Sequence, residues 1–124
     1  LGGEVRRVDT PEFGWHEVDT DLPDAIAPGP WFEWHYDGFT VPEGATEIAR
    51  TAVSPQAFRA GRSVGTQFHP EITVEIVNLW ISMDERALRA HGVDPAVMAA
   101  RTGEEAADNR ARSDALVDWF LDGD

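Results

Sequence analysis

The sequence contains no cysteine, and because lysine is also absent its basic residues are all arginine. Without a thiol the chain can form neither a disulfide nor a thiolate metal site, which fits a cytoplasmic protein. No run approaches the roughly 20 apolar residues that span a bilayer, and no basic segment followed by an apolar one opens the chain, so no signal peptide is visible. We therefore expect a cytoplasmic chain with no membrane partner.

Positive charge is scarce as well. Ten basic residues stand against 23 acidic ones, which gives a formal net charge of −13. Proteins that bind nucleic acids or anionic membranes need a basic surface, so both classes of partner are excluded. The 42% hydrophobic residues and five tryptophans nevertheless allow a buried core. At 124 residues the chain amounts to one domain or part of one.

Residues 64–71 read VGTQFHPE and predict a buried strand that ends in a polar corner. Pro70 fixes its own φ and favours an extended backbone at His69. Side chains on either side of one residue in an extended chain point the same way, so we expect His69 and Glu71 to share a face. A carboxylate beside an imidazole is the arrangement that supports a general base.

This octet resembles the G-x-Q-F-H-P-E motif of the class I, triad-type glutamine amidotransferases, and the similarity covers about residues 1–80. The resemblance implies an α/β fold with a flavodoxin-like open sheet, of which this chain would form the C-terminal half, followed by a helical tail. It also implies that His69 is the base and Glu71 the orienting carboxylate of a Cys-His-Glu triad. The nucleophilic cysteine, which the family carries in a G-x-C-x-G turn upstream, is missing here.

Leu1, Gly2 and Gly3 look like the end of the helix that follows this cysteine in the family, so we expect that Leu1 is not a natural start. The division expected is 1–82 for the amidotransferase-like half and 83–124 for a helical tail packed on it. The missing N-terminal half would be the first partner of the chain. Sheet edges left open by its absence could pair two copies into a homodimer.

The activity that the resemblance implies is the glutaminase half-reaction, an enzyme activity of nitrogen metabolism. Glutamine is hydrolysed to glutamate, and ammonia passes to an acceptor on a synthetase or transferase partner. No metal or organic cofactor is needed. As written, the chain should be inactive alone. Two alternatives stay open: an inactive relative that acts as a regulatory or interaction subunit, and a γ-glutamyl hydrolase-like enzyme that transfers only to water.

Residues 31–39 alternate, so one side of this predicted strand is expected in the core and the other to carry chemistry. The core side holds Phe32, Trp34 and Tyr36, and the other side holds Trp31, Glu33, His35 and Asp37. In the family this region lies near the glutamine pocket, which makes His35 and Asp37 the substrate-binding candidates. The alternative is that these two side chains hydrogen-bond each other and order the loop.

A metal site is not expected from the histidines, because His16, His35 and His69 show no ligand spacing on one element. The remaining elements follow from turn and capping signals. Strands are predicted over 3–8, 13–18, 46–53, 56–60 and 63–68, with a turn at 9–12. Thr73 should cap a helix that restarts at 82–85 and stops at Gly92, and a short helix should run from 95 to 101. A capping box at 102–105 is expected to open the last helix.

Overall fold

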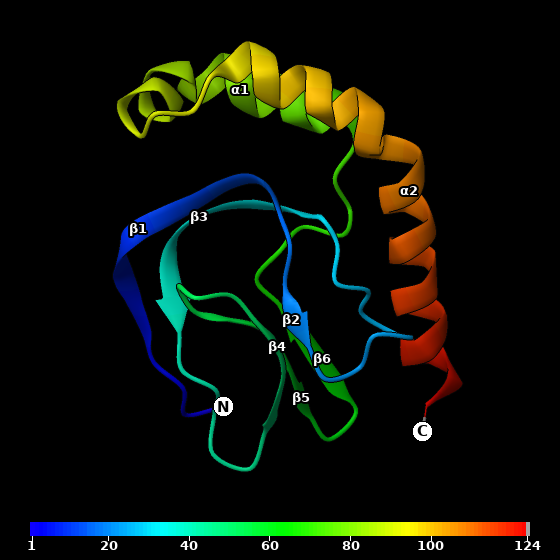
Figure 1. The fold of residues 1–124 in the computed structure, drawn as a ribbon. Coiled ribbons are helices and arrows are strands. Elements are labelled where there is room, and N and C mark those ends of the chain that lie inside the picture. Colours follow the sequence, from blue (N-terminus) through cyan, green and yellow to red (C-terminus); the bar gives the residue numbers. More distant parts are fainter. Residues whose placement is uncertain (124) are drawn as a thin grey trace.

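The structure, a computed structural model, describes residues 1–123 and has an α/β architecture in which six strands precede two helices. The elements are β1 (Val5–His16), β2 (Asp19–Thr20), β3 (Trp31–Phe39), β4 (Thr46–Arg50), β5 (Pro55–Ala60), β6 (Ser63–Thr66), α1 (Val74–Ala90) and α2 (Pro95–Asp122). Figure 1 shows the helices along the top and one side of the strands. No helix in the described part of the chain is long and apolar enough to cross a membrane.

The strands form two open antiparallel sheets. One contains β1 and β3, and the other has the order β2-β4-β5-β6. The prediction of two strands separated by a turn at 9–12 is wrong, because β1 is continuous across these residues. Its pairing with β3 shifts register between Arg7 and Glu12, so the chain absorbs the polar residues in an irregular stretch of strand instead of a turn.

Strand β3 is buried on both faces at its start. Trp31 belongs to a hydrophobic cluster that also contains Phe68, whose ring stacks on it at 4.4 Å between centroids. Phe32, the next residue, belongs to a second cluster with Phe13 and Val77. The expectation that only the Phe32 side lies in the core is therefore wrong. The strand is covered on its second side because α2 and the four-stranded sheet pack there.

Helix α1 begins where the sequence indicates. The Thr73 hydroxyl accepts a hydrogen bond from the backbone N–H of Ile76, and His91 is the C-terminal cap. Asp84 has non-helical dihedral angles (φ −140°, ψ 31°), so two helical segments meet there in a kink. The predicted restart of the helix within residues 82–85 is thus confirmed as a kink. The expected domain boundary at residue 82 falls inside α1, and the division into 1–82 and 83–124 stays a prediction.

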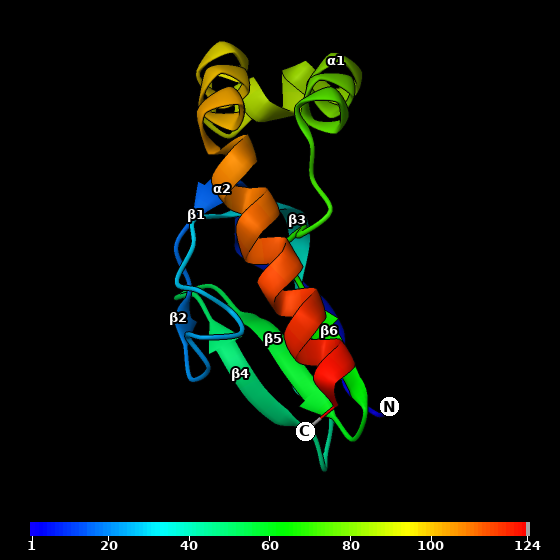
Figure 2. The ribbon, with the colours of Figure 1, turned by 90° about the vertical axis from the view of Figure 1, so that its right-hand side faces the viewer.

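Helix α2 is one element of 28 residues, so the predicted break after Arg101 is wrong. Thr102 does not cap a new helix, because its hydroxyl donates to the carbonyl oxygen of Met98 at 2.8 Å and accepts from the indole nitrogen of Trp15 at 3.0 Å. The helix changes direction along its length: its first half lies beside α1, and its second half runs along the four-stranded sheet (Figures 1 and 2). Leu116, in the second half, is part of the Trp31 cluster.

Candidate functional site

The candidate site is the corner that follows β6. His69 and Glu71 come together as expected, with 2.8 Å between His69 Nδ1 and Glu71 Oε1. The backbone N–H of His69 donates to the carbonyl oxygen of Phe32 at 2.9 Å, which ties the corner to β3. When Nδ1 donates to the carboxylate, Nε2 is the nitrogen that can accept a proton from a substrate or a nucleophile. The pair therefore has the geometry of a general base with an orienting carboxylate.

A hollow of about 270 Å³ opens beside His69. Its walls are Trp34, Trp80, Met83 and Asp84, together with the imidazole. Trp80 meets the His69 ring edge to face, with 4.9 Å between the centroids. Because Trp80 and Asp84 lie on α1 and Trp34 on β3, the hollow is shaped by both the helix layer and the strand layer. It is the place next to the imidazole where a small substrate could sit.

His35 does not face this hollow. Side chains alternate along β3, so His35 lies on the opposite side from Trp34. Its Nδ1 bonds to the backbone carbonyl of Asp37 at 2.8 Å, and the Asp37 carboxylate instead lies 3.8 Å from Arg7 and is half-exposed. The alternative was a hydrogen bond between the two side chains. The structure instead shows a bond from the His35 side chain to the Asp37 backbone. The substrate-binding role of His35 and Asp37 stays a prediction.

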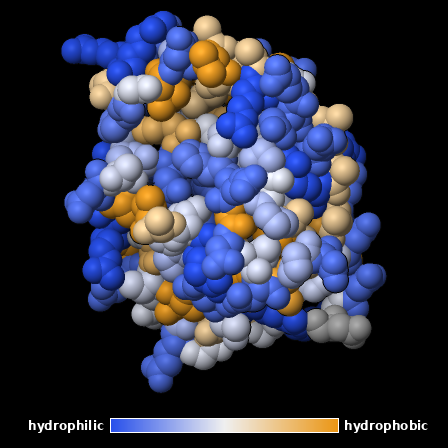
Figure 3. Space-filling model, in the orientation of Figure 1, coloured by the Kyte–Doolittle hydropathy of each residue, from blue (hydrophilic) through white to orange (hydrophobic). Residues whose placement is uncertain are grey.

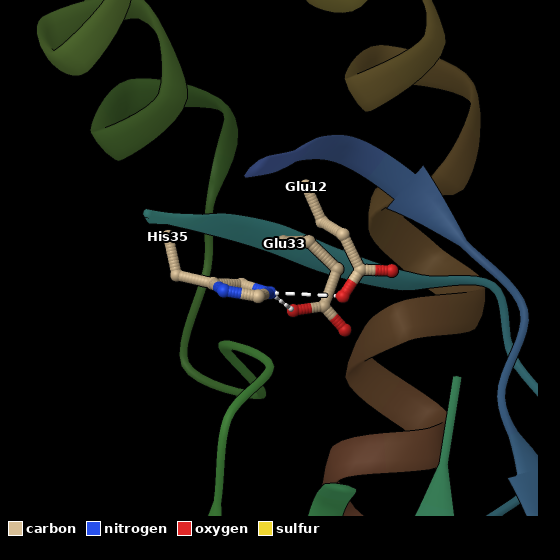
Figure 4. Close-up of side chains that lie close together, drawn as sticks. All are labelled: Glu12, Glu33 and His35. Carbon is tan, nitrogen blue, oxygen red and sulfur yellow. Dashed lines mark hydrogen bonds and ion pairs between the residues drawn. The ribbon is translucent and has the colours of Figure 1, made fainter. Parts of the chain in front are cut away.

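His35 belongs to a buried cluster with Glu12 and Glu33 (Figure 4). Its Nε2 lies 3.1 Å from Glu12 Oε1 and 3.3 Å from Glu33 Oε2. Burial lowers the pKa of His35, but its hydrogen bond to Glu12 and its ion pair with Glu33 outweigh this effect and raise that pKa to about 9. Burial raises the pKa of Glu33, although His35 opposes the shift. The two carboxyl groups therefore favour the protonated form of the His35 imidazole.

The ligand atoms of this cluster lie within 4.8 Å of one another, so its three side chains could hold a metal ion. Glu12 Oε1, however, already accepts hydrogen bonds from His35, from the Thr51 hydroxyl at 3.1 Å and from the Gln56 amide at 3.0 Å. An oxygen that already accepts three hydrogen bonds is a poor metal ligand. The expectation that the chain binds no metal stays a prediction. Sequence reasoning missed Glu12 and Gln56, while the spacing of Glu33 and His35 on one strand face was a usable signal.

Comparison with known proteins supplies the class. No family model matches the sequence. A GMP synthase (glutamine-hydrolysing) from Aeropyrum pernix is 38% identical over an alignment of 97 positions, which covers 67% of this chain and 19% of that protein. A crystal structure of a glutamine amidotransferase from Thermotoga maritima superposes with a TM-score of 0.83 at 25% identity, over 97% of this chain and 55% of that one. A glutamine amidotransferase from Methylobacillus flagellatus gives 0.83 at 24% identity, over 98% and 56%.

The fold is thus that of an amidotransferase, and the expected flavodoxin-like α/β class with a C-terminal helix is confirmed. The chain belongs to the class I glutamine amidotransferases, as part of such a domain. It spans about a fifth of the length of the curated relative and just over half of each solved structure.

Proposed function

We propose that this chain supplies the His–Glu part of a glutaminase site and that the nucleophilic cysteine lies in a preceding segment of the same protein or in a partner. The observation that carries the proposal is the 2.8 Å bond between His69 Nδ1 and Glu71 Oε1 at the end of the G-x-Q-F-H-P-E stretch. The hollow beside His69 supports it, because that hollow borders the imidazole from which a proton would be exchanged.

In the proposed reaction, His69 accepts the thiol proton while the sulfur bonds to the side-chain amide carbon of glutamine. The imidazolium then gives its proton to the departing nitrogen, the C–N bond breaks, and ammonia leaves behind a thioester. Water, deprotonated by the same imidazole, hydrolyses the thioester to glutamate and regenerates the thiol. Glu71 keeps the imidazole in the tautomer with Nδ1 protonated throughout.

The ammonia would pass to an acceptor on a synthetase domain or partner outside this chain. The similarity to a glutamine-hydrolysing GMP synthase supports a synthetase acceptor, and it fits a cytoplasmic setting. The relatives share the amidotransferase class. The acceptor site would lie in other parts of the whole protein, because this chain covers only 19% of the GMP synthase.

The test is ammonia and glutamate release from glutamine by the protein that includes the cysteine segment. His69→Ala should lower kcat by at least about 100-fold, since the base and the acid are lost together. Glu104→Gln, which removes an exposed carboxylate on α2, is the control and should leave kcat unchanged. Wild-type protein that releases no ammonia from glutamine, alone or with its synthetase, would rule out the proposal.

A further inference from the structure

The carbonyl oxygen of Pro70, between the two site residues, is held by the second half of α2. Ser113 Oγ donates to it at 2.6 Å, and Asn109 Nδ2 donates at 3.4 Å. Residues four apart in a helix lie on one face, so α2 presents both donors to the same oxygen. The helix thus contacts the site corner directly through two polar side chains from more than 35 positions away in the sequence.

The helix that carries these donors is itself fixed against the strands. Leu116 is buried in the cluster that contains Trp31 and Phe68, and the Arg112 guanidinium lies 5.8 Å from the centre of the Trp31 ring. Phe68 immediately precedes His69 in the chain. The donors therefore sit on a rigid support that shares its core with the strand leading into the site.

The backbone geometry makes this carbonyl a sensitive point. The proline ring fixes φ of Pro70, so three backbone rotations remain between the two site residues: ψ of His69, ψ of Pro70 and φ of Glu71. Rotation about ψ turns the Pro70 carbonyl and swings Glu71 at the same time. His69 is held separately by its bond to Phe32. Fixing the carbonyl direction thus fixes ψ of Pro70 and narrows the positions that the Glu71 carboxylate can take relative to the imidazole.

Asn109 is not explained by packing alone. Its side chain is 2% exposed, and its Oδ1 has no hydrogen-bond partner among the described residues. A buried acceptor without a partner costs stability that an apolar side chain of the same size would not. Proteins tend to keep such destabilising buried polar groups at functional sites, so Asn109 is a candidate for a functional role.

We propose that Asn109 and Ser113 are positioning residues for the His69–Glu71 pair. The inference rests on the glutaminase function proposed above. It assigns α2 a role in the reaction: the helix holds Glu71 in reach of Nδ1, so that the imidazole keeps Nε2 free to accept the proton. Neither residue touches the substrate in this scheme.

The experiment uses the protein with its cysteine segment and compares Ser113→Ala, Asn109→Leu and the double variant with wild type. We expect kcat for glutamine to fall about 10- to 100-fold, as for other small misplacements of a reacting group, with KM within about twofold. Ser113→Thr, which keeps the hydroxyl, should restore most of the activity. Arg110→Ala, on the 80% exposed side chain of the same helix, is the matched control and should behave as wild type.

A second readout does not depend on activity. The ¹⁵N chemical shifts of the neutral His69 ring report which nitrogen carries the proton, and wild type should show the Nδ1–H tautomer. Ser113→Ala and the double variant should shift towards a mixture of tautomers. Unchanged ring shifts together with unchanged kcat in the double variant would overturn the inference. A loss of kcat with unchanged ring shifts and no rescue by Ser113→Thr would reduce both residues to a structural role.

The two proposals can fail separately. If wild type has no glutaminase activity, the proposed function fails, yet the ring shifts still decide whether α2 orients the pair. If wild type is active and neither the ring shifts nor kcat of the double variant change, only the positioning role fails. Should the double variant not fold, the Ser113→Ala and Ser113→Thr pair gives the same decision, because removal and return of one hydroxyl on an existing helix changes little volume.

Discussion

At the scale of single residues, Gly65 illustrates why the amidotransferase stretch carries a glycine before its glutamine. Gly65 pairs with Phe58 across β5 and β6, and a Cβ added at position 65 would lie 2.5 Å from the Phe58 ring. Only glycine, which has no side chain, leaves room for the Phe58 ring to lie over β6 at position 65. The glycine is therefore a packing requirement of the strand that leads into His69.

We predict that Gly65→Ala lowers the free energy of unfolding by about 1–3 kcal/mol, the usual cost of overpacking. Gly103→Ala is the contrasting variant, because position 103 is helical and a Cβ added there would meet no other atom within 4 Å. It should raise stability by roughly 0.5–1 kcal/mol. Urea denaturation of both variants checks the pair, and equal effects of the same sign would contradict the packing argument.

The buried cluster predicts a pH dependence of stability. Against the opposing effect of burial, Glu12 and Glu33 raise the pKa of His35 from 6.5 to about 9 in the folded protein. Because the folded pKa is the higher one, this stabilisation is fully present below about pH 6.5 and is lost as the pH rises through about 9. The free energy of unfolding should fall by up to about 3 kcal/mol across this window.

Chemical denaturation at a series of pH values between these limits measures the effect. His35→Gln removes the titrating group, so its stability should be lower at neutral pH and nearly constant across the window. His91→Gln, an exposed imidazole at the end of α1, is the control and should retain the wild-type slope. A flat wild-type profile would show that His35 is neutral in the folded protein.

At the scale of elements, the second half of α2 is held by its apolar contacts with the strands. Leu116 is 6% exposed and lies in the Trp31 cluster, whereas the neighbouring Val117 is 51% exposed. We predict that Leu116→Ala costs about 2–5 kcal/mol, while Val117→Ala stays within about 0.5 kcal/mol. Thermal and urea unfolding of the two variants provides the comparison, and similar losses for both would mean that α2 is not anchored by this face.

The two helices also show what local signals can and cannot predict. The cap at Thr73 and the break near Asp84 were readable because both depend on residues close in the sequence. The capping box at Thr102 gave a wrong prediction of a new helix. Its hydroxyl accepts a hydrogen bond from the Trp15 indole, which lies 87 positions away in the sequence. A hydroxyl with a tertiary partner cannot be distinguished from a cap by sequence pattern alone.

At the scale of the whole molecule, charge and open strand edges act in opposite directions. β6 is the last strand of its sheet in the described residues, so one of its edges is unpaired. Figure 3 shows a mainly hydrophilic face with small, separate hydrophobic patches. The net charge of −13 keeps copies apart at low ionic strength, and salt screens this repulsion.

We therefore predict that residues 1–124 alone self-associate more strongly as the salt concentration rises, because strand edges then meet with less repulsion. Light scattering after gel filtration at low and high salt measures the mass. Protein that contains the cysteine segment should show a weaker dependence, since that segment would cover part of the exposed surface. A chain that stays monomeric at high salt would argue against edge pairing and against the expected homodimer.

The sequence was most informative where the site depends on neighbouring residues. His69 and Glu71 are two positions apart, so an extended backbone alone brings them together. Glu12 could not be assigned, because its place opposite His35 depends on a register shift in β1. The contact of Ser113 with Pro70 spans 43 positions and requires the second half of α2 to run along the strands, and no local pattern indicates that contact.

The bond from the His69 amide to the Phe32 carbonyl also makes this amide a reporter of cooperativity. Phe32 and its neighbour Trp31 belong to different hydrophobic clusters, so the acceptor sits where the two cores adjoin. Local fraying of either helix would leave the bond intact. Deuterium should thus enter at His69 only when both cores open together, and its exchange rate would track global unfolding even though the imidazole itself faces a solvent-accessible hollow.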